Sequence, residues 1–506
     1  MSAPDPQPGG GSWRASLGVV AAGLALGLSF VDFRLWLVPW FAVAPFVALG
    51  ESLDPGRAWR VGWLGGVVGI ACAFAWLIHA FQVFGGFPLP VALLLFMPPV
   101  AWMGLELGLF TGLLAWVGRW PMALAAPCTF TAVELVFPTL FPWRLAHTQY
   151  AVVPLLQSGE IAGPYLLGFA MVWMNAALVR LWRDREWRPF VGASVLVLAL
   201  AVGGVWRAAE IEDLRRMAPV IRVGVVQGNI GVERKGERAM FRRNLDDYRR
   251  LSTALGDTVD LIVWPETVAQ RAIPTGLDNP AGDLHPFPRP PRPLIFGGLA
   301  IGEGREGRRI HNSAFLVDTS GTIRGRYDKR VLVPFGEYLP FADRYPWLRQ
   351  WSPATGRFSP GMGPALLTTP DGARLGPLIC YEDVIPGPAR EAVALGAQVL
   401  LNLTNDAWYG DTAEPHQHQA LALWRAVETR RDFIRSTNTG LTATISATGT
   451  IMGELPLFVA VTQRVEVRLL ELTTFYTAWG DVFAGAVLTA WVIGVIAHRR
   501  YRGALP

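Results

Sequence analysis

The sequence predicts a chain of two parts: a multi-pass α-helical membrane domain of about eight spans, seven before and one after an extramembrane domain of the α/β class. Three observations predict it. Only 17% of the residues are charged, whereas soluble globular proteins carry about 25%, and charged side chains are costly in hydrocarbon. Long apolar runs fill the first 206 residues and return near the C-terminus. Between them, short β-branched runs alternate with polar amphipathic stretches.

Eight runs near 20 residues long carry at most one charge each, which is the pattern of membrane-spanning helices. They lie at 15–31, 35–50, 61–81, 89–117, 122–140, 161–179, 190–206 and 478–497. The second run is short, and the fourth is long and contains Pro98 and Pro99, so either could be a kinked or interfacial segment. The first run is too long, and followed too closely by others, to be a cleaved signal peptide.

Arginine content alternates between successive loops, which predicts the orientation of the chain. The arginine-rich loops follow the second, fourth, sixth and last spans and contain Arg57, Arg60, Arg119, Arg180, Arg183, Arg185, Arg188, Arg499, Arg500 and Arg502. Because such loops stay in the cytoplasm, both termini are expected there and the extramembrane domain outside, which in a bacterial cell is the periplasm. The expected domains are 1–206 (membrane helices), 207–477 (extramembrane) and 478–506 (last span and cytoplasmic tail).

The extramembrane segment is expected to contain eight strands and three helices. The strands are expected at 221–227, 261–264, 294–299, 313–317, 375–380, 399–403, 433–437 and 442–446, and the helices at 237–255, 388–395 and 415–430. The proline-dense segment 279–293 is expected to be a surface loop.

The composition argues against two classes of site. The net charge of +5 is small for this length, and there is no zinc-finger spacing or Lys/Arg run, so nucleic acid is not an expected partner. Cys72, Cys128 and Cys380 lie far apart and the first two sit in apolar runs, so neither a disulfide framework nor a CxxC metal site is expected. Cys380 is the only thiol of the extramembrane segment.

Polar residues follow three of the expected strands. Glu266 comes just after 261–264, Cys380 ends 375–380, and Asn405 and Asp406 follow 399–403. In open α/β sheets, ligands bind outside the carboxyl ends of the strands. We therefore expect these side chains to line one pocket, together with Lys329, which is one of only two lysines in the chain.

These residue types suit nucleophilic acyl transfer. A thiol with a pKa of about 8.5 is mostly protonated at neutral pH and needs a base or a nearby cation before it attacks a carbonyl. Glu266 can take the proton, Lys329 can hold the developing oxyanion, and the backbone N–H of Tyr381 can be a second donor. Each residue alone also has an ordinary role: Cys380 as a small buried hydrophobe, Glu266 as a helix cap and Lys329 as a solvated charge.

Four motifs together resemble the nitrilase (carbon-nitrogen hydrolase) superfamily. They are WPET at 264–267, YDKRVLVPFGEYLP at 327–340, ICYED at 379–383 and NLTNDAWYG at 402–410. With seven spans before such a domain and one after it, the whole chain resembles the apolipoprotein N-acyltransferases of the bacterial inner membrane, which are membrane-bound members of that superfamily.

The resemblance implies an αββα sandwich facing the periplasm and a ping-pong reaction. The acyl chain of a phospholipid passes to a cysteine as a thioester and then to the α-amine of the N-terminal diacylglyceryl-cysteine of an apolipoprotein. By motif position, Glu266 is the general base, Lys329 the oxyanion stabiliser and Cys380 the nucleophile, while Glu337 and Glu382 match supporting carboxylates. No metal or organic cofactor is implied, and a monomer is expected.

An apolar lid is expected next to this site. The stretch 341–362 contains Trp347, Trp351 and Phe358 between glycines, and could dip among acyl chains, with Trp408 adding to its edge. The alternative is that these aromatic side chains pack on the core of their own domain.

Two other functions stay open at this point. The same triad could serve a membrane-tethered amidase or nitrilase that acts on small amides, although a tether needs one span rather than eight. A third reading is a transporter or scaffold whose outer domain is an inactive nitrilase fold that only binds.

Overall fold

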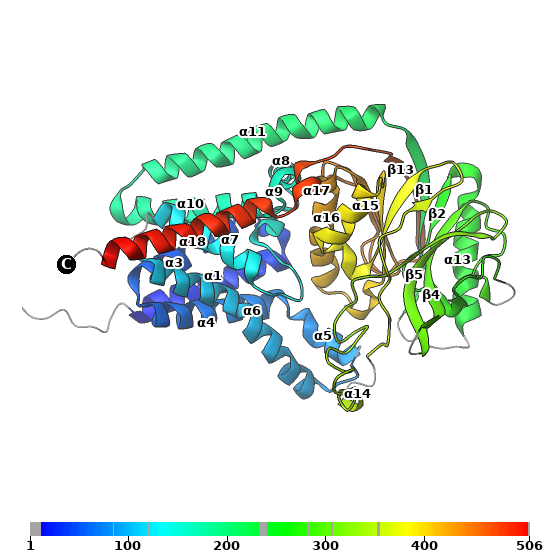
Figure 1. Cartoon of the computed structure of the whole chain (residues 1–506), viewed down its shortest axis with the longest axis horizontal. Helices are drawn as coiled ribbons and strands as arrows, with labels where there is room; N and C mark the ends of the chain where they lie inside the picture. Colours follow the sequence, from blue (N-terminus) through cyan, green and yellow to red (C-terminus); the bar gives the residue numbers. More distant parts are fainter. Residues whose placement is uncertain are drawn as a thin grey trace, which may run out of the picture. The chain divides into compact units, whose positions relative to one another are not determined.

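The computed structural model of the 506-residue chain describes residues 12–83, 85–118, 122–231, 240–280, 284–304, 307–351 and 355–503. Arg119, the first residues of the expected helix 237–255 and residues 281–283 of the proline-dense loop therefore lie outside the described residues. The chain divides into two compact units. Unit 1 comprises residues 1–82, 87–206 and 479–506, and unit 2 comprises 83–86 and 207–478. Figure 1 labels the elements of both units.

Unit 1 is helical. Its described elements are α1 (Ser12–Val31), η1 (Phe33–Leu35), α2 (Pro39–Ala42), α3 (Ala44–Ser52), α4 (Pro55–Ala73), α5 (Trp76–Val83), α6 (Leu89–Val117), α7 (Met122–Val136), η2 (Leu145–Gln149), α8 (Val153–Leu156), α9 (Gly159–Ala162), α10 (Tyr165–Asp184), α11 (Arg188–Met217, continuing into unit 2) and α18 (Val482–Gly503).

Among the described helices, α6, α10 and α11 are long and apolar enough to cross a membrane. A fourth candidate is the pair α4 and α5, if these two helices, bent by 56°, form one broken span. Shorter apolar helices occupy Ser16–Val31, Ala123–Val136 and Val482–Ala497. The expected count of about eight spans is therefore not confirmed and stays a prediction.

The expected span 35–50 is divided into η1, α2 and α3, with a proline in the first turn of α2 and of α3. The buried Asn175 of α10 supports this break. Its side-chain oxygen accepts from the backbone N–H of Ala44 at 2.8 Å, and its amide donates to the carbonyl of Pro39 at 3.0 Å. The backbone groups that a helix break leaves unpaired are thus satisfied by a side chain far away in the sequence.

Small residues let the helices of unit 1 approach closely. A Cβ on Gly23 of α1 would collide with the backbone of Gly65 in α4, and a Cβ on Gly66 would collide with that of Gly104 in α6. Helix contacts built on small residues are typical of membrane bundles, because lipid gives no hydrophobic drive for helices to associate.

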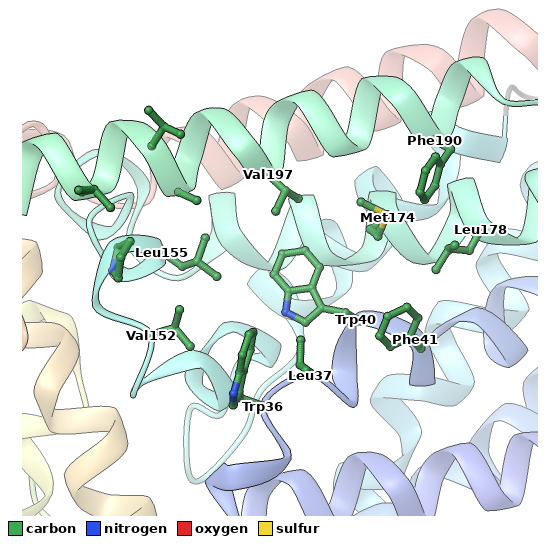
Figure 2. Close-up of a pocket in the computed structure, with 14 residues that line it drawn as sticks. Trp36, Leu37, Trp40, Phe41, Val152, Leu155, Met174, Leu178, Phe190 and Val197 are labelled. Carbon is green, nitrogen blue, oxygen red and sulfur yellow. The ribbon is translucent and has the colours of Figure 1, made fainter.

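An apolar groove of about 670 Å³ lies between α11 and the segments of α2, α8 and α10 (Figure 2). At one point α11 approaches the backbone of α8 closely, because a Cβ on Gly204 would collide with the carbonyl of Pro154. All of the side chains that line the groove are hydrophobic: Trp36, Leu37, Trp40, Phe41, Val152, Pro154, Leu155, Met174, Leu178, Phe190, Val197, Ala201, Val202 and Val205.

Unit 2 contains two β-sheets. The first sheet has the order β13-β1-β2-β4-β5-β6, with β3 paired to β4. Its strands are β1 (Val220–Gln227), β2 (Leu261–Val263), β3 (Ala269–Pro274), β4 (Leu294–Gly304), β5 (Gly307–Val317), β6 (Ile323–Asp328) and β13 (Val461–Arg468). The second sheet has the order β12-β11-β10-β9-β8-β7 and comprises β7 (Leu367–Thr368), β8 (Arg374–Ile379), β9 (Val399–Thr404), β10 (Asp432–Thr437), β11 (Ala443–Ile445) and β12 (Ile451–Glu454).

The sheets and helices of unit 2 form four layers. One buried core joins Val223 and Val225 of β1 to Leu401 of β9 and Ile434 of β10, so the two sheets pack face to face. A second core lies on the outer face of the first sheet, where α13 (Phe241–Leu255) packs. Helices α15 (Pro386–Ala394) and α16 (Glu414–Thr429) contact the second sheet, on the side away from α13 in Figure 1. The arrangement is the expected αββα sandwich. Two short helices, α14 (Leu348–Trp351) and α17 (Phe475–Trp479), complete the unit.

All eight expected strands correspond to strands of unit 2, namely β1, β2, β4, β5, β8, β9, β10 and β11. Five further strands, β3, β6, β7, β12 and β13, were not expected. β6 (IRGRYD) and β13 (VTQRVEVR) are outer strands of the first sheet whose side chains are largely polar and in part exposed, so they lack the apolar runs that predict a buried strand.

Candidate active site

The three residues of the expected triad follow strand ends in unit 2. Glu266 follows β2, Lys329 directly follows β6, and Cys380 directly follows β8. Strands β8 and β9 are parallel, with Ile379 opposite Leu403, so the residues after both strands emerge at the same sheet edge. The strand of Lys329 belongs to the first sheet and that of Cys380 to the second. The site is therefore built by both layers of the sandwich.

Cys380 has a left-handed backbone conformation, with a φ of 49°, at the start of a tight 3-10 turn (η6, Cys380–Asp383). A non-glycine residue in this region stores strain, which is typical of a side chain held out at a sharp strand-to-helix turn. The side-chain amide of Asn402 on β9 donates to the Cys380 carbonyl at 2.9 Å and fixes the turn.

Glu382 connects the turn of Cys380 to the segment of Lys329. Its fully buried carboxylate accepts from the backbone N–H of Ile379 at 2.9 Å, and from those of Arg330 and Val331 at 2.8 and 3.0 Å. It also accepts from the Tyr327 hydroxyl at 2.9 Å. Burial raises the pKa of Glu382 although these backbone donors oppose the rise. One carboxylate thus ties the turn of Cys380 to the segment that follows Lys329.

Lys329 lies in a buried cluster of acid and amide groups. Its side chain is 1% exposed, and the ammonium forms an ion pair with Glu337 Oε2 at 2.8 Å. The side-chain amide of Asn312 on β5 donates to Glu266 Oε1 at 2.7 Å and to Glu337 Oε1 at 3.2 Å. Asn312 therefore holds the two carboxylates together in front of the lysine.

The charges of this cluster act on one another and on the thiol. Burial lowers the pKa of Lys329, but the negative charges of Glu337 and Glu266 outweigh it, so the pKa is raised and the side chain is an ammonium ion; a thiolate at Cys380 would raise this pKa further. Burial, followed by the charge of Glu266, raises the pKa of Cys380 well above its ordinary value, and the Lys329 ammonium opposes this rise. Cys380 is therefore a thiol at neutral pH, and it would need a base to take its proton before it could act as a nucleophile.

The expected lid residues differ in exposure. Trp347 is 53% exposed, whereas Phe358 and Trp408 are half-buried, and the side chain of Trp351 lies outside the described residues. Four further aromatic residues, which the sequence did not single out, are exposed between 335 and 347: Phe335, Tyr338, Phe341 and Tyr345. Tyr381 is half-buried next to the nucleophile, and burial raises the pKa of its phenol to about 12. The exposed aromatic stretch 335–347 begins two residues before Glu337.

A second buried network of charged side chains lies next to the turn that begins at Cys380. His418 of α16 bonds Asp383 through Nε2 at 2.7 Å and Asp406 through Nδ1 at 3.2 Å. Arg435 of β10 donates to Asp383 at 3.1 Å and to Asp406 at 3.5 Å. Burial lowers the pKa of His418, but Asp383 and Asp406 outweigh it and raise the pKa to about 10. Two cations thus balance two buried carboxylates.

Asp406, Glu414 and His418 have ligand atoms within 4.8 Å of one another, a spacing that could hold a metal ion. The chemistry of the donor set argues for a proton instead. An imidazolium has an N–H on both nitrogens and cannot ligate a metal, and both nitrogens of His418 already have carboxylate partners. The cations that compensate Asp406 are therefore the His418 imidazolium and the Arg435 guanidinium.

Comparison with known proteins finds a matching protein family for each unit. Residues 22–177 match the family model of the apolipoprotein N-acyltransferase N-terminal domain, and residues 222–474 match that of carbon-nitrogen hydrolases. An apolipoprotein N-acyltransferase of Geobacter metallireducens is 33% identical over 96% of both chains. One of Azotobacter vinelandii is 32% identical over 92% of both chains. The chain belongs to the apolipoprotein N-acyltransferase family. This membership confirms the family that the four motifs and the membrane spans together predicted.

Several residues of this acyltransferase site were not selected from the sequence. Asn312 stands before an expected strand, where an asparagine is an ordinary turn residue. Asp383 lies in the ICYED motif, but its partner His418 is 35 positions away. A polar residue on an amphipathic helix or a core strand indicates a functional site only when it is known to be buried. The sequence alone does not show that burial.

Proposed function

We propose that this chain transfers a fatty acyl group from a membrane phospholipid, through a thioester on Cys380, to the α-amino group of the N-terminal diacylglyceryl-cysteine of apolipoproteins. The observation that carries the proposal is the pairing of a half-buried, protonated thiol with the Lys329, Glu337, Asn312 and Glu266 cluster. Family membership supplies the substrate class.

The first half-reaction forms the thioester. Glu266 takes the thiol proton, and the thiolate of Cys380 attacks the ester carbonyl of the phospholipid. The negative charge that develops on the carbonyl oxygen is stabilised by the Lys329 ammonium and by the backbone N–H of Tyr381. When the tetrahedral intermediate collapses, the C–O bond breaks and Glu266 returns the proton to the departing lysophospholipid oxygen.

The second half-reaction forms the amide. The free amine of the apolipoprotein attacks the thioester carbonyl, and Glu266 takes a proton from the nitrogen. The C–S bond then breaks, and the same proton returns to the Cys380 sulfur. Glu337 and Glu382 act through their neighbours: Glu337 by its ion pair with Lys329, and Glu382 by bonding the backbone on both sides of the site.

The amine must reach the thioester before water does, which calls for a shielded site at the lipid surface. We infer that the exposed aromatic side chains of 335–347, including Trp347, form an apolar lip that contacts acyl chains. Phe358 and Trp408 support the base of this lip. Their half-buried position suits this supporting role. Trp351 ends the short helix α14 in the same segment and is proposed to belong to the lip.

We further propose that unit 1 crosses the bacterial inner membrane about eight times, with domain limits at 206 and 478 and with the catalytic domain in the periplasm. Two observations support this placement: the arginine-rich alternate loops and the exposure of large apolar side chains on the helices of unit 1. The groove of Figure 2, lined only by hydrophobic side chains, suits an acyl chain of the bilayer. Alkaline phosphatase fused after residues 217 and 503 tests the orientation, and activity of the second fusion would contradict it.

The deciding experiment is the mass of the intact protein after incubation with phospholipid. A fatty-acyl adduct on Cys380 that disappears when a diacylglyceryl-cysteine peptide is added supports acyl transfer. An adduct that forms only with small amides would favour a membrane-tethered amidase. A Cys380→Ser variant that fully supports lipoprotein maturation in cells would favour a binding role without catalysis.

A further inference from the structure

Thr404 lies beside the nucleophile, although no role in the triad chemistry falls to it. Strands β8 and β9 are paired in parallel with Ile379 opposite Leu403, so the next residues, Cys380 and Thr404, leave neighbouring strands at the same edge. Thr404 is fully buried. Its hydroxyl lies close enough to the Cys380 side chain to act on it as a hydrogen-bond partner, which lowers the pKa of the thiol.

The same hydroxyl also reaches a carboxylate. Thr404 Oγ1 donates to Asp406 Oδ1 at 3.3 Å. A hydroxyl has a single hydrogen and so cannot donate to the sulfur and to Asp406 at once. While Cys380 is a thiol, its S–H can donate to the Thr404 oxygen and the hydroxyl can donate to Asp406. A thiolate can only accept, so the hydroxyl has to turn toward the sulfur when the proton leaves.

Asp406 can spare this donor because it has two charged neighbours. The His418 imidazolium bonds it at 3.2 Å and the Arg435 guanidinium at 3.5 Å. Both cations are held in turn by Asp383, at 2.7 and 3.1 Å. The buried network therefore keeps the charge of Asp406 compensated in either orientation of the hydroxyl.

We propose that the Thr404 hydroxyl is a switchable hydrogen-bond donor for the Cys380 sulfur. It donates to Asp406 while the sulfur is a thiol or a thioester, and to the sulfur each time the thiolate forms. Thr404 thus acts in both half-reactions: when Glu266 has taken the thiol proton, and when the amine expels the sulfur from the thioester. The thiol proton moves to Glu266 and back, and at Thr404 only the O–H direction changes.

Several groups besides Thr404 act on the thiol. Glu266 and Glu337 disfavour the thiolate, Lys329 favours it, and the Tyr409 phenol lies near enough to interact with the sulfur electrostatically. Thr404 differs from the two glutamates and the lysine in being uncharged. Its removal changes the hydrogen bonding of the sulfur without changing the charge of the site.

The test is the pH dependence of Cys380 alkylation in the full-length protein. Iodoacetamide is added at a series of pH values, and mass spectrometry of the Cys380 peptide gives the rate without interference from Cys72 and Cys128. We expect Thr404→Val to move the alkylation midpoint to higher pH and to slow the reaction at neutral pH. Thr404→Ser, which keeps a hydroxyl, should restore the profile. Thr369→Val serves as the control, because it removes a buried hydroxyl that bonds only Ala373 N near the opposite end of β8.

A Thr404→Val profile that coincides with that of the parent overturns the proposal, and so does a Thr404→Ser profile shifted as far as that of Val. If Thr404→Val does not fold, Thr404→Ala gives the same test without the added methyl group. A loss of packing alone would lower the unfolding temperature or speed alkylation, but it would not move the midpoint upward.

The inference rests on Cys380 being the nucleophile of the proposed function. Acyl transfer by the parent protein after alkylation at Cys380 checks that premise separately. Retained transfer would contradict the proposed function, whereas an unshifted Thr404→Val profile in an enzyme that alkylation inactivates would contradict only the role of Thr404.

Discussion

The two units place apolar and charged side chains in opposite ways. In unit 1, large hydrophobic residues lie on the outside, such as Leu94 at 70% and Leu198 at 63% exposure, and helices meet through glycines. In unit 2, the hydrophobic residues fill two cores, while Lys329, Glu382, Asp383 and Arg435 are buried. An apolar exterior is stable only where water is absent, and buried charges are stable only where partners compensate them. The exposed apolar side chains of unit 1 therefore indicate an apolar environment around it. The buried charged side chains of unit 2 indicate where its chemistry takes place.

The largest expected effect comes from removing the chemistry of unit 2. Cys380→Ala and Glu266→Gln should each lower acyl transfer by about 10⁴-fold, because each removes one member of a triad whose members act together. Transfer of a radiolabelled acyl chain to a diacylglyceryl-cysteine peptide measures the loss. Cys72→Ala in unit 1 is the matched control and should keep full activity. Activity of Cys380→Ala within tenfold of the parent would show that the thiol of Cys380 is structural.

Lys329 tests whether the buried cluster is built for a compact charge. Removing one oxyanion donor costs about 10²–10³-fold in rate, so Lys329→Ala should lose that much. We expect Lys329→Arg to fail nearly as badly, because the side chain is 1% exposed and its ammonium lies 2.8 Å from Glu337, which leaves no room for a guanidinium. The single-turnover rate of thioester formation is the measurement. An active Lys329→Arg enzyme would contradict the size argument but not the triad.

The glycine contacts sharpen the other side of the comparison. Gly66→Val places a side chain against the backbone of Gly104, whereas Gly18→Val in α1 has nothing within 4 Å of its Cβ. Overpacking costs about 1–3 kcal/mol, so the first variant should unfold at a lower temperature in detergent and the second should not. Equal unfolding temperatures would mean that α4 and α6 can separate at little cost.

His418 makes the stability of unit 2 depend on pH. Its folded pKa of about 10 is above the ordinary value of 6.5, so its stabilising effect is fully present below about pH 6.5 and is lost as the pH rises through about 10. The unfolding temperature of the parent should fall over that range. His418→Gln should be less stable at neutral pH and should show a flatter profile. His311→Gln, whose ring bonds only the Ser359 carbonyl, is the control. A parent profile that is flat between pH 6.5 and 10 would mean that the histidine is neutral.

The sequence allowed the prediction of features that depend on one segment at a time. Apolar runs predicted the buried strands β1, β2, β8 and β9, and the polar residues after them predicted the strand ends, one in each sheet, that Glu266 and Cys380 follow. It did not allow the prediction of features that depend on two distant segments. Asn312 belongs to the site only because β5 pairs with β4 and β6, and Asn312 reaches Glu266 across 46 positions. The breaks within 35–50 likewise depend on Asn175, from another helix.

The smallest expected effect concerns the exposed aromatic stretch 335–347. Here unit 2 exposes hydrophobic side chains instead of burying them in a core. Trp347 is 53% exposed, and burying such a side chain against an acyl chain is worth about 1 kcal/mol, or about fivefold in affinity. Trp347→Ala should therefore raise the KM for long-chain phospholipid about fivefold and leave kcat for a short-chain ester unchanged. Leu395→Ala, an apolar residue exposed to a similar degree after α15, is the control. If both substrates lose activity equally, Trp347 supports the fold of the site rather than contacting the acyl chain, and the exposed stretch is not a lipid contact.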